Sequence, residues 1–291
     1  MSILLHRDTR VCIQGITGQM GRFQTTEMLA YGTRVVAGVS PGKGGTSFAG
    51  VPIFNTVHQA VAETGAELSC LWMGAGRAKE AIFEAQDAGV KTIVCVAEFM
   101  PVHDMVLIKQ RLRGSPTRLI GPNCSGLISP GQAKAGFYCA EVCAVGDIGV
   151  MSKSGTLGYT VLLELKRRGF GESTVVGVGG DEIKGTTFRE CLELFEADPD
   201  TRAMVLIGEI GGRDEEEAAD YVARHVTKPV VAFLAGRTIP PGHSVGHAGA
   251  IVVGAKGTYE AKRRALTDAG APVARTIEEI PELLRARGAT G

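Results

Sequence analysis

The residue best suited to carry out chemistry is His247, which lies in the glycine-rich stretch 242–250. Gly246 on one side and Ala248 on the other are small, so a phosphorylated group or another backbone can approach the imidazole closely. A histidine in such a setting can act as a nucleophile that takes up a phosphoryl group. Taken alone, the same residues also fit a solvated histidine in a surface loop, so the surrounding fold must decide between these interpretations.

Two other segments place a carboxylate and an anion-binding turn just after predicted strands. Glu209 follows an apolar run, and a carboxylate beside an imidazole fixes its tautomer and stabilises its protonated form. Ser154, Gly155 and Thr156 follow another apolar run and open a helix, whose first N–H groups attract anions. Glu209 could instead cap a glycine-rich turn, and Ser154 could be a simple helix N-cap.

Alternation of apolar runs with helical patterns predicts an α/β fold. Strands are expected at 10–14, 35–39, 68–73, 92–96, 118–120, 147–152, 175–178, 204–207 and 229–234. Helices are expected at 21–31, 57–64, 78–88, 103–113, from about 155 to 168, 187–196 and 215–225. This order indicates two domains, 1–145 and 146–291, each a parallel sheet with helices on both faces, joined by an aperiodic connection over 126–146. Ligands of such sheets gather beyond the carboxyl ends of strands, so Ser154, Glu209 and His247 should share one edge.

A second phosphate-binding turn is predicted after the first strand, at Gly15-Ile16-Thr17-Gly18-Gln19-Met20-Gly21. Its glycine spacing differs from the dinucleotide-binding fingerprint, and no acidic residue follows the second strand to hold a ribose hydroxyl. An NAD-dependent dehydrogenase is therefore disfavoured. Lys43 after the second strand suits a ligand with an additional phosphate, such as coenzyme A. A tight turn without any ligand would need similar glycines.

Composition excludes several classes of function. Lys plus Arg and Asp plus Glu both number 31, so no net charge favours nucleic acid or an anionic membrane as a partner. No segment has the pattern of a secretory signal or a membrane span, and the seven scattered cysteines favour reduced thiols in the cytoplasm or an organelle matrix. Cysteine and histidine spacing predicts no metal site.

Several motifs occur together along nearly the whole chain. They are Tyr31-Gly32-Thr33, Pro41-Gly42-Lys43-Gly44-Gly45, Phe54-Asn55-Thr56-Val57, Gly121-Pro122-Asn123-Cys124, Ser152-Lys153-Ser154-Gly155-Thr156-Leu157, Gly208-Glu209-Ile210-Gly211-Gly212, Lys228-Pro229-Val230 and Gly246-His247-Ala248-Gly249-Ala250. In this order and spacing, the chain resembles the α subunits of the succinate–CoA ligase (succinyl-CoA synthetase) family.

This resemblance implies an N-terminal Rossmann-like CoA-binding domain and a C-terminal flavodoxin-like domain. His247 matches the phosphorylated histidine of the family, Glu209 the glutamate that contacts it, and Ser154, Gly155 and Thr156 the helix start that holds the phosphoryl group. Tyr159 matches a position near the organic acid, and Asn123 is expected in the same region. The residues that match the CoA site are Thr17, Gly18, Gln19, Met20, Lys43, Val96, Ala97 and Glu98.

The implied reaction needs a β subunit with an ATP-grasp fold, which holds ATP or GTP and Mg²⁺. The γ-phosphoryl group passes to His247 and then to a dicarboxylate, and CoA displaces phosphate from the acyl phosphate. A neutral imidazole suits this relay because it is a good nucleophile.

The chain departs from the family pattern at three places. Met73-Gly74-Ala75-Gly76-Arg77 and Val96-Ala97-Glu98-Phe99 differ from the usual segments beside CoA. Ser125 replaces a proline and adds an N–H and a hydroxyl next to the expected acyl site, which would suit malate, citrate or another more polar dicarboxylate as well as succinate. A non-catalytic CoA-binding regulator with the same fold is the alternative outside the enzymes.

Overall fold

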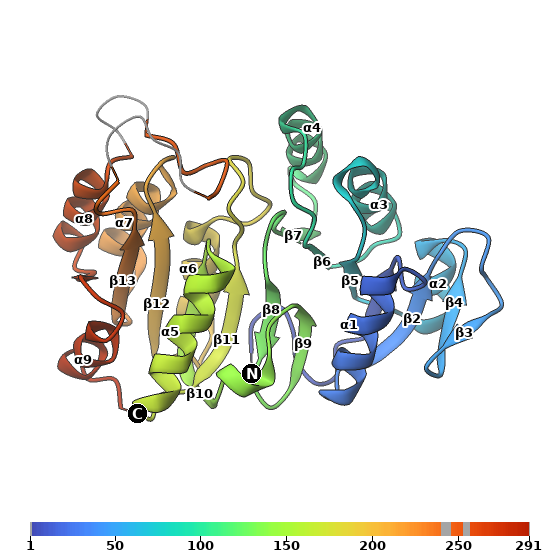
Figure 1. Ribbon diagram of the computed structural model, residues 1–291, viewed down its shortest axis with the longest axis horizontal. Coiled ribbons are helices and arrows are strands. Elements are labelled where there is room, and N and C mark those ends of the chain that lie inside the picture. The colour runs from blue at the N-terminus through green and yellow to red at the C-terminus, as the bar shows by residue number, and fades with distance from the viewer. Residues whose placement is uncertain (1, 240–245, 253–256, 291) are drawn as a thin grey trace.

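Two mixed, mainly parallel sheets lie side by side in the computed structural model, which describes residues 2–239, 246–252 and 257–290 (Figure 1). The first sheet has the strand order β3-β4-β2-β1-β5-β6-β7. Its strands are β3 (Ser47–Phe48), β4 (Val51–Phe54), β2 (Val35–Val39), β1 (Val11–Gln14), β5 (Leu68–Leu71), β6 (Thr92–Cys95) and β7 (Arg118–Ile120). All neighbours in it are parallel except the short pair β3 and β4.

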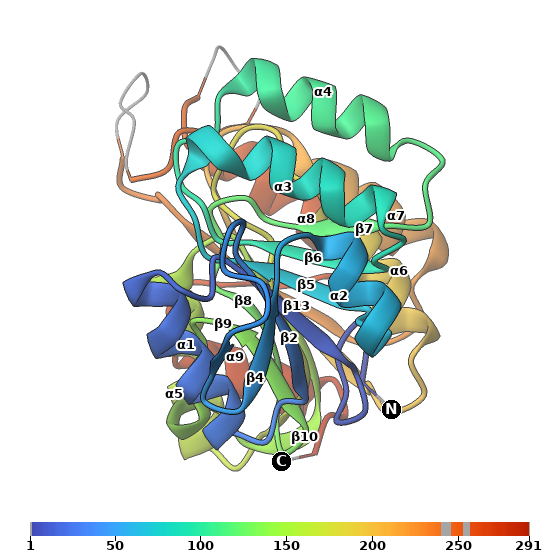
Figure 2. The same cartoon turned by 90° about the vertical axis from the view of Figure 1, so that its right-hand side faces the viewer.

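Helices cover both faces of the first sheet because its central strands are apolar on both sides. Helices α2 (Val57–Thr64), α3 (Ala75–Asp87) and α4 (Val102–Leu112) share one buried cluster with one face. Helix α1 (Gln19–Ala30) lies on the opposite side, as Figure 2 shows. Its Met28 packs into a cluster with Ile13 of β1.

The second sheet has the order β14-β13-β12-β10-β11-β8-β9. Its strands are β14 (Val273–Ala274), β13 (Val230–Ala235), β12 (Ala203–Glu209), β10 (Val145–Ser152), β11 (Glu172–Gly177), β8 (Gly126–Ser129) and β9 (Ala133–Gly136). Helices α5 (Gly155–Arg167) and α9 (Glu279–Ala286) share a buried cluster with one face. Helices α6 (Phe188–Ala197), α7 (Asp214–His225) and α8 (Tyr259–Asp268) pack against the other.

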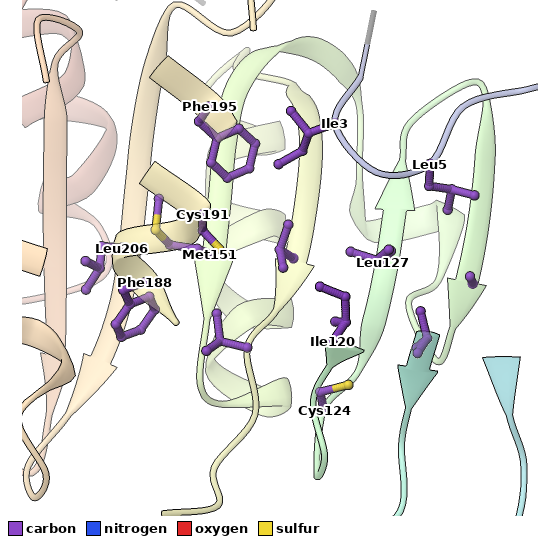
Figure 3. Close-up of a cluster of buried hydrophobic side chains, with 14 of the residues drawn as sticks. Ile3, Leu5, Ile120, Cys124, Leu127, Met151, Phe188, Cys191, Phe195 and Leu206 are labelled. Atoms are coloured by element: carbon purple, nitrogen blue, oxygen red, sulfur yellow. The ribbon is translucent and has the colours of Figure 1, made fainter. Parts of the chain in front are cut away.

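One hydrophobic cluster runs from the first sheet into the second. Ile120 at the end of β7 and Leu127 of β8 belong to the same cluster as Phe188 and Phe195 of α6 (Figure 3). Leu5 from the N-terminal segment also joins it, and the hydroxyl of Ser129 on β8 donates to the Leu5 carbonyl at 2.7 Å. The two sheets are therefore packed together rather than connected by an open linker.

The predicted fold class is confirmed, and most predicted elements occur within a few residues of their expected ends. The connection predicted over 126–146 is instead mostly the antiparallel hairpin β8–β9 followed by a short 3₁₀ helix, Ala140–Val142. Strands β8 and β9 precede residue 145, yet β8 pairs with β11 of the second sheet. The chain therefore passes from the first sheet to the second between β7 and β8. The predicted domain boundary at residue 145 stays a prediction about where the two folding units divide. Strands β3, β4 and β14 were not predicted, since β3 and β14 have only two residues and β4 only four, which is too short to show a period.

The described residues include no helix that is both long enough and apolar enough to cross a bilayer.

Candidate phosphoryl-transfer site

His247 and Glu209 form a direct pair at the carboxyl edge of the second sheet. Nδ1 of His247 lies 2.7 Å from Oε2 of Glu209, the last residue of β12. The carboxylate accepts, so Nδ1 carries the proton and Nε2 of the neutral ring keeps its lone pair. The hydrogen bond to Glu209 raises the pKa of His247 above its usual 6.5, against the opposing effect of burial. Residues 242–245 of the predicted stretch lie outside the described residues.

The imidazole lies directly over the backbone of Gly180. A Cβ at this position would be 2.3 Å from Cγ of His247, so no larger residue fits while the ring is there. The next residue, Asp181, is buried and accepts a hydrogen bond from Nδ2 of Asn123 at 3.0 Å. Burial raises the pKa of Asp181, and its charge helps to raise that of His247. Asn123 follows the first sheet and Asp181 follows β11, so this bond joins the two sheets beside the histidine.

A small cavity of about 190 Å³ opens beside His247 between the two sheets. Glu98 and Asn123 line it from the side of the first sheet, and Asp181 and His247 from the side of the second. Phe99, Met100, Val102 and Met105 form its apolar wall. The structure therefore brings a predicted CoA residue, a predicted substrate residue and the predicted phosphoryl carrier to one space.

The start of α5 lies next to the end of β12. Ser152 of β10 is paired with Ile207 of β12, so the residues after each strand emerge side by side. Ser154 caps α5 by accepting from the Leu157 N–H at 3.3 Å, which is the N-cap role that the sequence left open. Lys153 lines a cavity together with Glu209, and its positive charge acts to lower the pKa of His247. No hydrogen bond among the described residues joins His247 to Ser154, Gly155 or Thr156.

Ser125 packs against the first residue of α5. A Cβ on Gly155 would be 2.6 Å from Oγ of Ser125, which places this hydroxyl at the helix start. Tyr159 lies one turn further along, and its hydroxyl donates to the Phe137 carbonyl at 2.7 Å. Of the predicted acid-binding residues, only Asn123 lines the cavity with His247.

The predicted CoA turn lies at a larger cavity of about 770 Å³ at the carboxyl edge of the first sheet. Thr17 and Gly18 line it, as do Gly74, Gly76 and Arg77 of the segment that departs from the family pattern. The side chains of Gln19, Met20 and Lys43 are exposed, and none of them lines this cavity. Val96 and Ala97 do not line it either. Ala97 instead accepts from the Asn123 N–H at 2.8 Å and so supports the loop beside His247.

Asp181 is the site residue that sequence reasoning missed. The signal was present, since Gly179-Gly180-Asp181 follows a predicted strand in the same way as Glu209. What the sequence lacked was any sign that this strand, β11, lies next to β10. The described residues contain no group of three His, Cys, Asp or Glu side chains that could hold a metal ion.

Comparison with known proteins identifies the family. Residues 6–99 match the model of a CoA binding domain, and residues 151–272 match that of a CoA-ligase. The chain is 51% identical over 285 residues to succinate–CoA ligase [ADP-forming] subunit alpha 1 of Archaeoglobus fulgidus, and the matched residues cover 98% of each chain. It is 50% identical to the corresponding alpha subunit of Aquifex aeolicus, over 97% of this chain and 93% of that one. The chain belongs to the succinate–CoA ligase α-subunit family.

Two solved structures with lower sequence identity share the fold. ATP citrate lyase from Methanothrix soehngenii, in complex with citrate and coenzyme A, superposes with a TM-score of 0.89 at 24% identity. The match covers 99% of this chain and 52% of that one, so the chain spans about half the length of the lyase. A dinucleotide-forming acetyl-coenzyme A synthetase from Ca. Korarchaeum cryptofilum gives a TM-score of 0.76 at 19% identity, over 94% and 59% of the two chains.

Proposed function

We propose that this chain is the α subunit of a succinate–CoA ligase that works only together with a β subunit. The β subunit, with an ATP-grasp fold, would hold ATP or GTP and Mg²⁺. The observation that carries the proposal is the pair of His247 and Glu209, which leaves Nε2 of the ring available as a nucleophile beside a cavity shared by both sheets. A regulator that only bound CoA would not need a histidine held in this tautomer.

The reaction would pass through two phosphorylated intermediates. Nε2 of His247 attacks the γ-phosphorus of the nucleotide, and the nucleoside diphosphate (ADP or GDP) leaves. A carboxylate oxygen of the acid then attacks phosphorus, which breaks the N–P bond and gives an acyl phosphate. Finally the CoA thiol attacks the acyl carbon, and the C–O bond to phosphate breaks as the thioester forms, so that phosphate leaves together with the thiol proton. Glu209 stabilises the positive charge that the ring acquires during the first step.

The start of α5 is proposed as the resting place of the phosphoryl group. Its Gly155 and Thr156 N–H groups belong to the first helical turn, and such groups have no partner within a helix. Lys153 lies beside this turn and beside Glu209, so its charge favours an anion there. The proposal requires the His247 ring to move towards this turn, because no hydrogen bond joins the two among the described residues.

CoA is proposed to bind at the edge of the first sheet, with its phosphates at the turn of Thr17, Gly18, Gln19 and Met20. Lys43 would take the 3′-phosphate, and Val96, Ala97 and Glu98 would lie along the arm that leads towards His247. Glu98 lines the cavity at His247 and Thr17 the larger one, so the two ends of the proposed CoA site flank one sheet edge.

The compartment is proposed to be reducing, and the cytoplasm fits this requirement. All seven cysteines are free, and six of them are buried. Burial raises the pKa of buried thiols such as Cys12, to about 12, so these thiols stay neutral and serve packing.

The test is an assay of thioester formation with the purified α and β subunits, CoA, Mg²⁺ and either ATP or GTP. Succinate, malate and citrate are supplied separately. The proposal expects succinyl-CoA to form only when both subunits are present. Absence of any acyl-CoA product with an intact α–β complex would favour the regulator.

A ligase for a more polar dicarboxylate is the second candidate, and the position of Ser125 favours it. The hydroxyl of Ser125 lies at the start of α5, where a substrate hydroxyl could pair with it. Higher kcat/KM for malate or citrate than for succinate in the same assay would select this candidate.

A further inference from the structure

Lys262 of α8 is a fully buried lysine whose ammonium group contacts the backbone at Glu209, one of the residues of the proposed phosphoryl-transfer site. Its Nζ donates to the carbonyl oxygen of Glu209 at 2.9 Å and to that of Gly211. It also forms an ion pair with the carboxylate of Glu215, which is fully buried as well. Two of the three polar contacts that Nζ makes with described residues are therefore to the backbone on either side of Ile210, just after the end of β12.

Glu215 holds the other side of the same peptide segment. Its Oε1 accepts from the backbone N–H of Glu209 at 3.1 Å and pairs with Nζ of Lys153 at 2.8 Å. The lysines lower the pKa of Glu215 although burial acts in the opposite direction, so the carboxylate stays ionised. The N–H and the carbonyl of Glu209 are thus both bound by buried charged side chains.

A buried ammonium group costs several kcal/mol of desolvation, and apolar side chains of similar size would often give equal or greater stability. The neighbouring buried residues of α8, Tyr259 and Leu266, show that this helix otherwise packs through large uncharged side chains. Stability alone therefore gives little reason for a lysine here. The contacts to Glu209 offer a different reason.

We infer that Lys262 is a positioning residue, which fixes the carboxylate of Glu209 against His247 by holding the Glu209 carbonyl. This role rests on the proposed function in one respect only, namely that His247 is the phosphoryl carrier. Because Glu209 selects the tautomer of the imidazole, a shift of its backbone would weaken the 2.7 Å contact and leave Nε2 less well placed.

The first test measures the pKa of the His247 ring by NMR in the unphosphorylated full-length chain. In Lys262→Met it should fall towards 6.5, because the contact with Glu209 that raises it is weakened. Loss of a nearby positive charge would by itself raise this pKa, so a fall separates positioning from simple electrostatics. His247→Gln identifies the resonance.

Lys228 provides a matched control. Its Nζ also donates to two backbone carbonyls, those of Phe195 at 2.7 Å and Asp198 at 2.6 Å. Lys228 itself lies just before the amino end of β13, whereas the site residues follow the carboxyl ends of strands. Lys228→Met should lower the melting temperature without changing the His247 pKa. An equal pKa change in both variants, or an unchanged pKa in Lys262→Met, would overturn the inference. If Lys262→Met does not fold, Lys262→Gln takes its place with the same two outcomes.

The second test follows phosphorylation of the α subunit by ATP and the β subunit. Lys262→Met should be about 10- to 100-fold slower, the range expected when a reacting group is displaced by about an ångström. In a Glu209→Gln background, the same change should cause almost no further loss. Rate losses that multiply would contradict action through Glu209. If the unchanged protein is not phosphorylated at all, the proposed function fails, whereas the NMR result still decides the role of Lys262.

Discussion

Single residues set the chemistry of the site. Glu209 determines which nitrogen of His247 is free, and Gly180 provides the space in which the ring lies. Asn123 and Asp181 then join the two sheets next to the ring. That His247, Glu209 and Asn123 belong to one candidate site could be predicted from the sequence, because each follows a strand or lies in a distinctive motif. Their mutual distances could not, since these depend on which strands are neighbours.

Ser125 is predicted to influence which acid reacts. Ser125→Ala removes the hydroxyl beside Gly155 while keeping the backbone N–H, so kcat/KM for malate should fall about tenfold if that hydroxyl binds the substrate. The value for succinate should change little, because succinate has no hydroxyl to pair. Steady-state kinetics of the α–β complex with both acids measure this. Equal losses for the two acids would show that Ser125 acts only on the structure of the loop.

At the level of elements, parallel strands deliver the site residues to one edge. Helix α5 begins directly after β10, and Glu209 ends the neighbouring strand β12. Strand β11 ends before Gly179 and supplies Gly180 and Asp181 from the other side of β10. Alternation of strands and helices made this edge predictable. The β8–β9 hairpin was not, because its two strands are four residues long, rich in glycine and alanine, and carry no clear alternation.

Two helix N-caps give a matched comparison at this scale. Ser154 caps α5 at the proposed phosphoryl site, whereas Thr187 caps α6, and neither Thr187 nor any residue of α6 lines the cavities at His247 and Lys153. Ser154→Ala and Thr187→Ala should each lower the free energy of unfolding by about 1 kcal/mol, measured by urea denaturation. Only Ser154→Ala should slow the phosphorylation of His247. A similar slowing in Thr187→Ala would mean that general stability, rather than the start of α5, controls the rate.

The whole molecule is held together by a core that both sheets share, with Leu5, Ile120 and Leu127 at the seam (Figure 3). Residues that follow strands of both sheets, such as Asn123 and Asp181, line the small cavity at His247, so relative movement of the sheets would change the site directly. A two-domain α/β organisation was predictable from length and periodicity. The shared core was not, because apolar runs do not reveal which sheet they will pack against.

Glu172 of β11 should make overall stability depend on pH. Burial raises the pKa of Glu172 to about 8, and its Oε2 accepts from the Ala144 N–H at 3.0 Å. Below pH 4.5 both the folded and unfolded chains bind the proton. Between pH 4.5 and 8 only the folded chain keeps it, so stability falls by up to about 5 kcal/mol as the pH rises through this window.

Glu172→Gln, which cannot ionise, should remove most of this decline and be more stable than the unchanged protein at pH 8. Urea denaturation at pH 5.5 and pH 8 measures the difference. Glu217→Gln, on the exposed side of α7, serves as the control and should leave the pH dependence unchanged. If Glu172→Gln retains the full decline, Glu172 is not the group that titrates.

The most direct measurement is the transfer of a radioactive phosphoryl group to and from His247. The α subunit is incubated with γ-³²P-ATP, Mg²⁺ and its β subunit, and then with succinate and CoA. We expect an acid-labile label on His247 that is lost when both substrates are added, with no label in His247→Ala. Normal labelling of His247→Ala, or a label that succinate and CoA do not discharge, would contradict the assignment of His247 as the phosphoryl carrier.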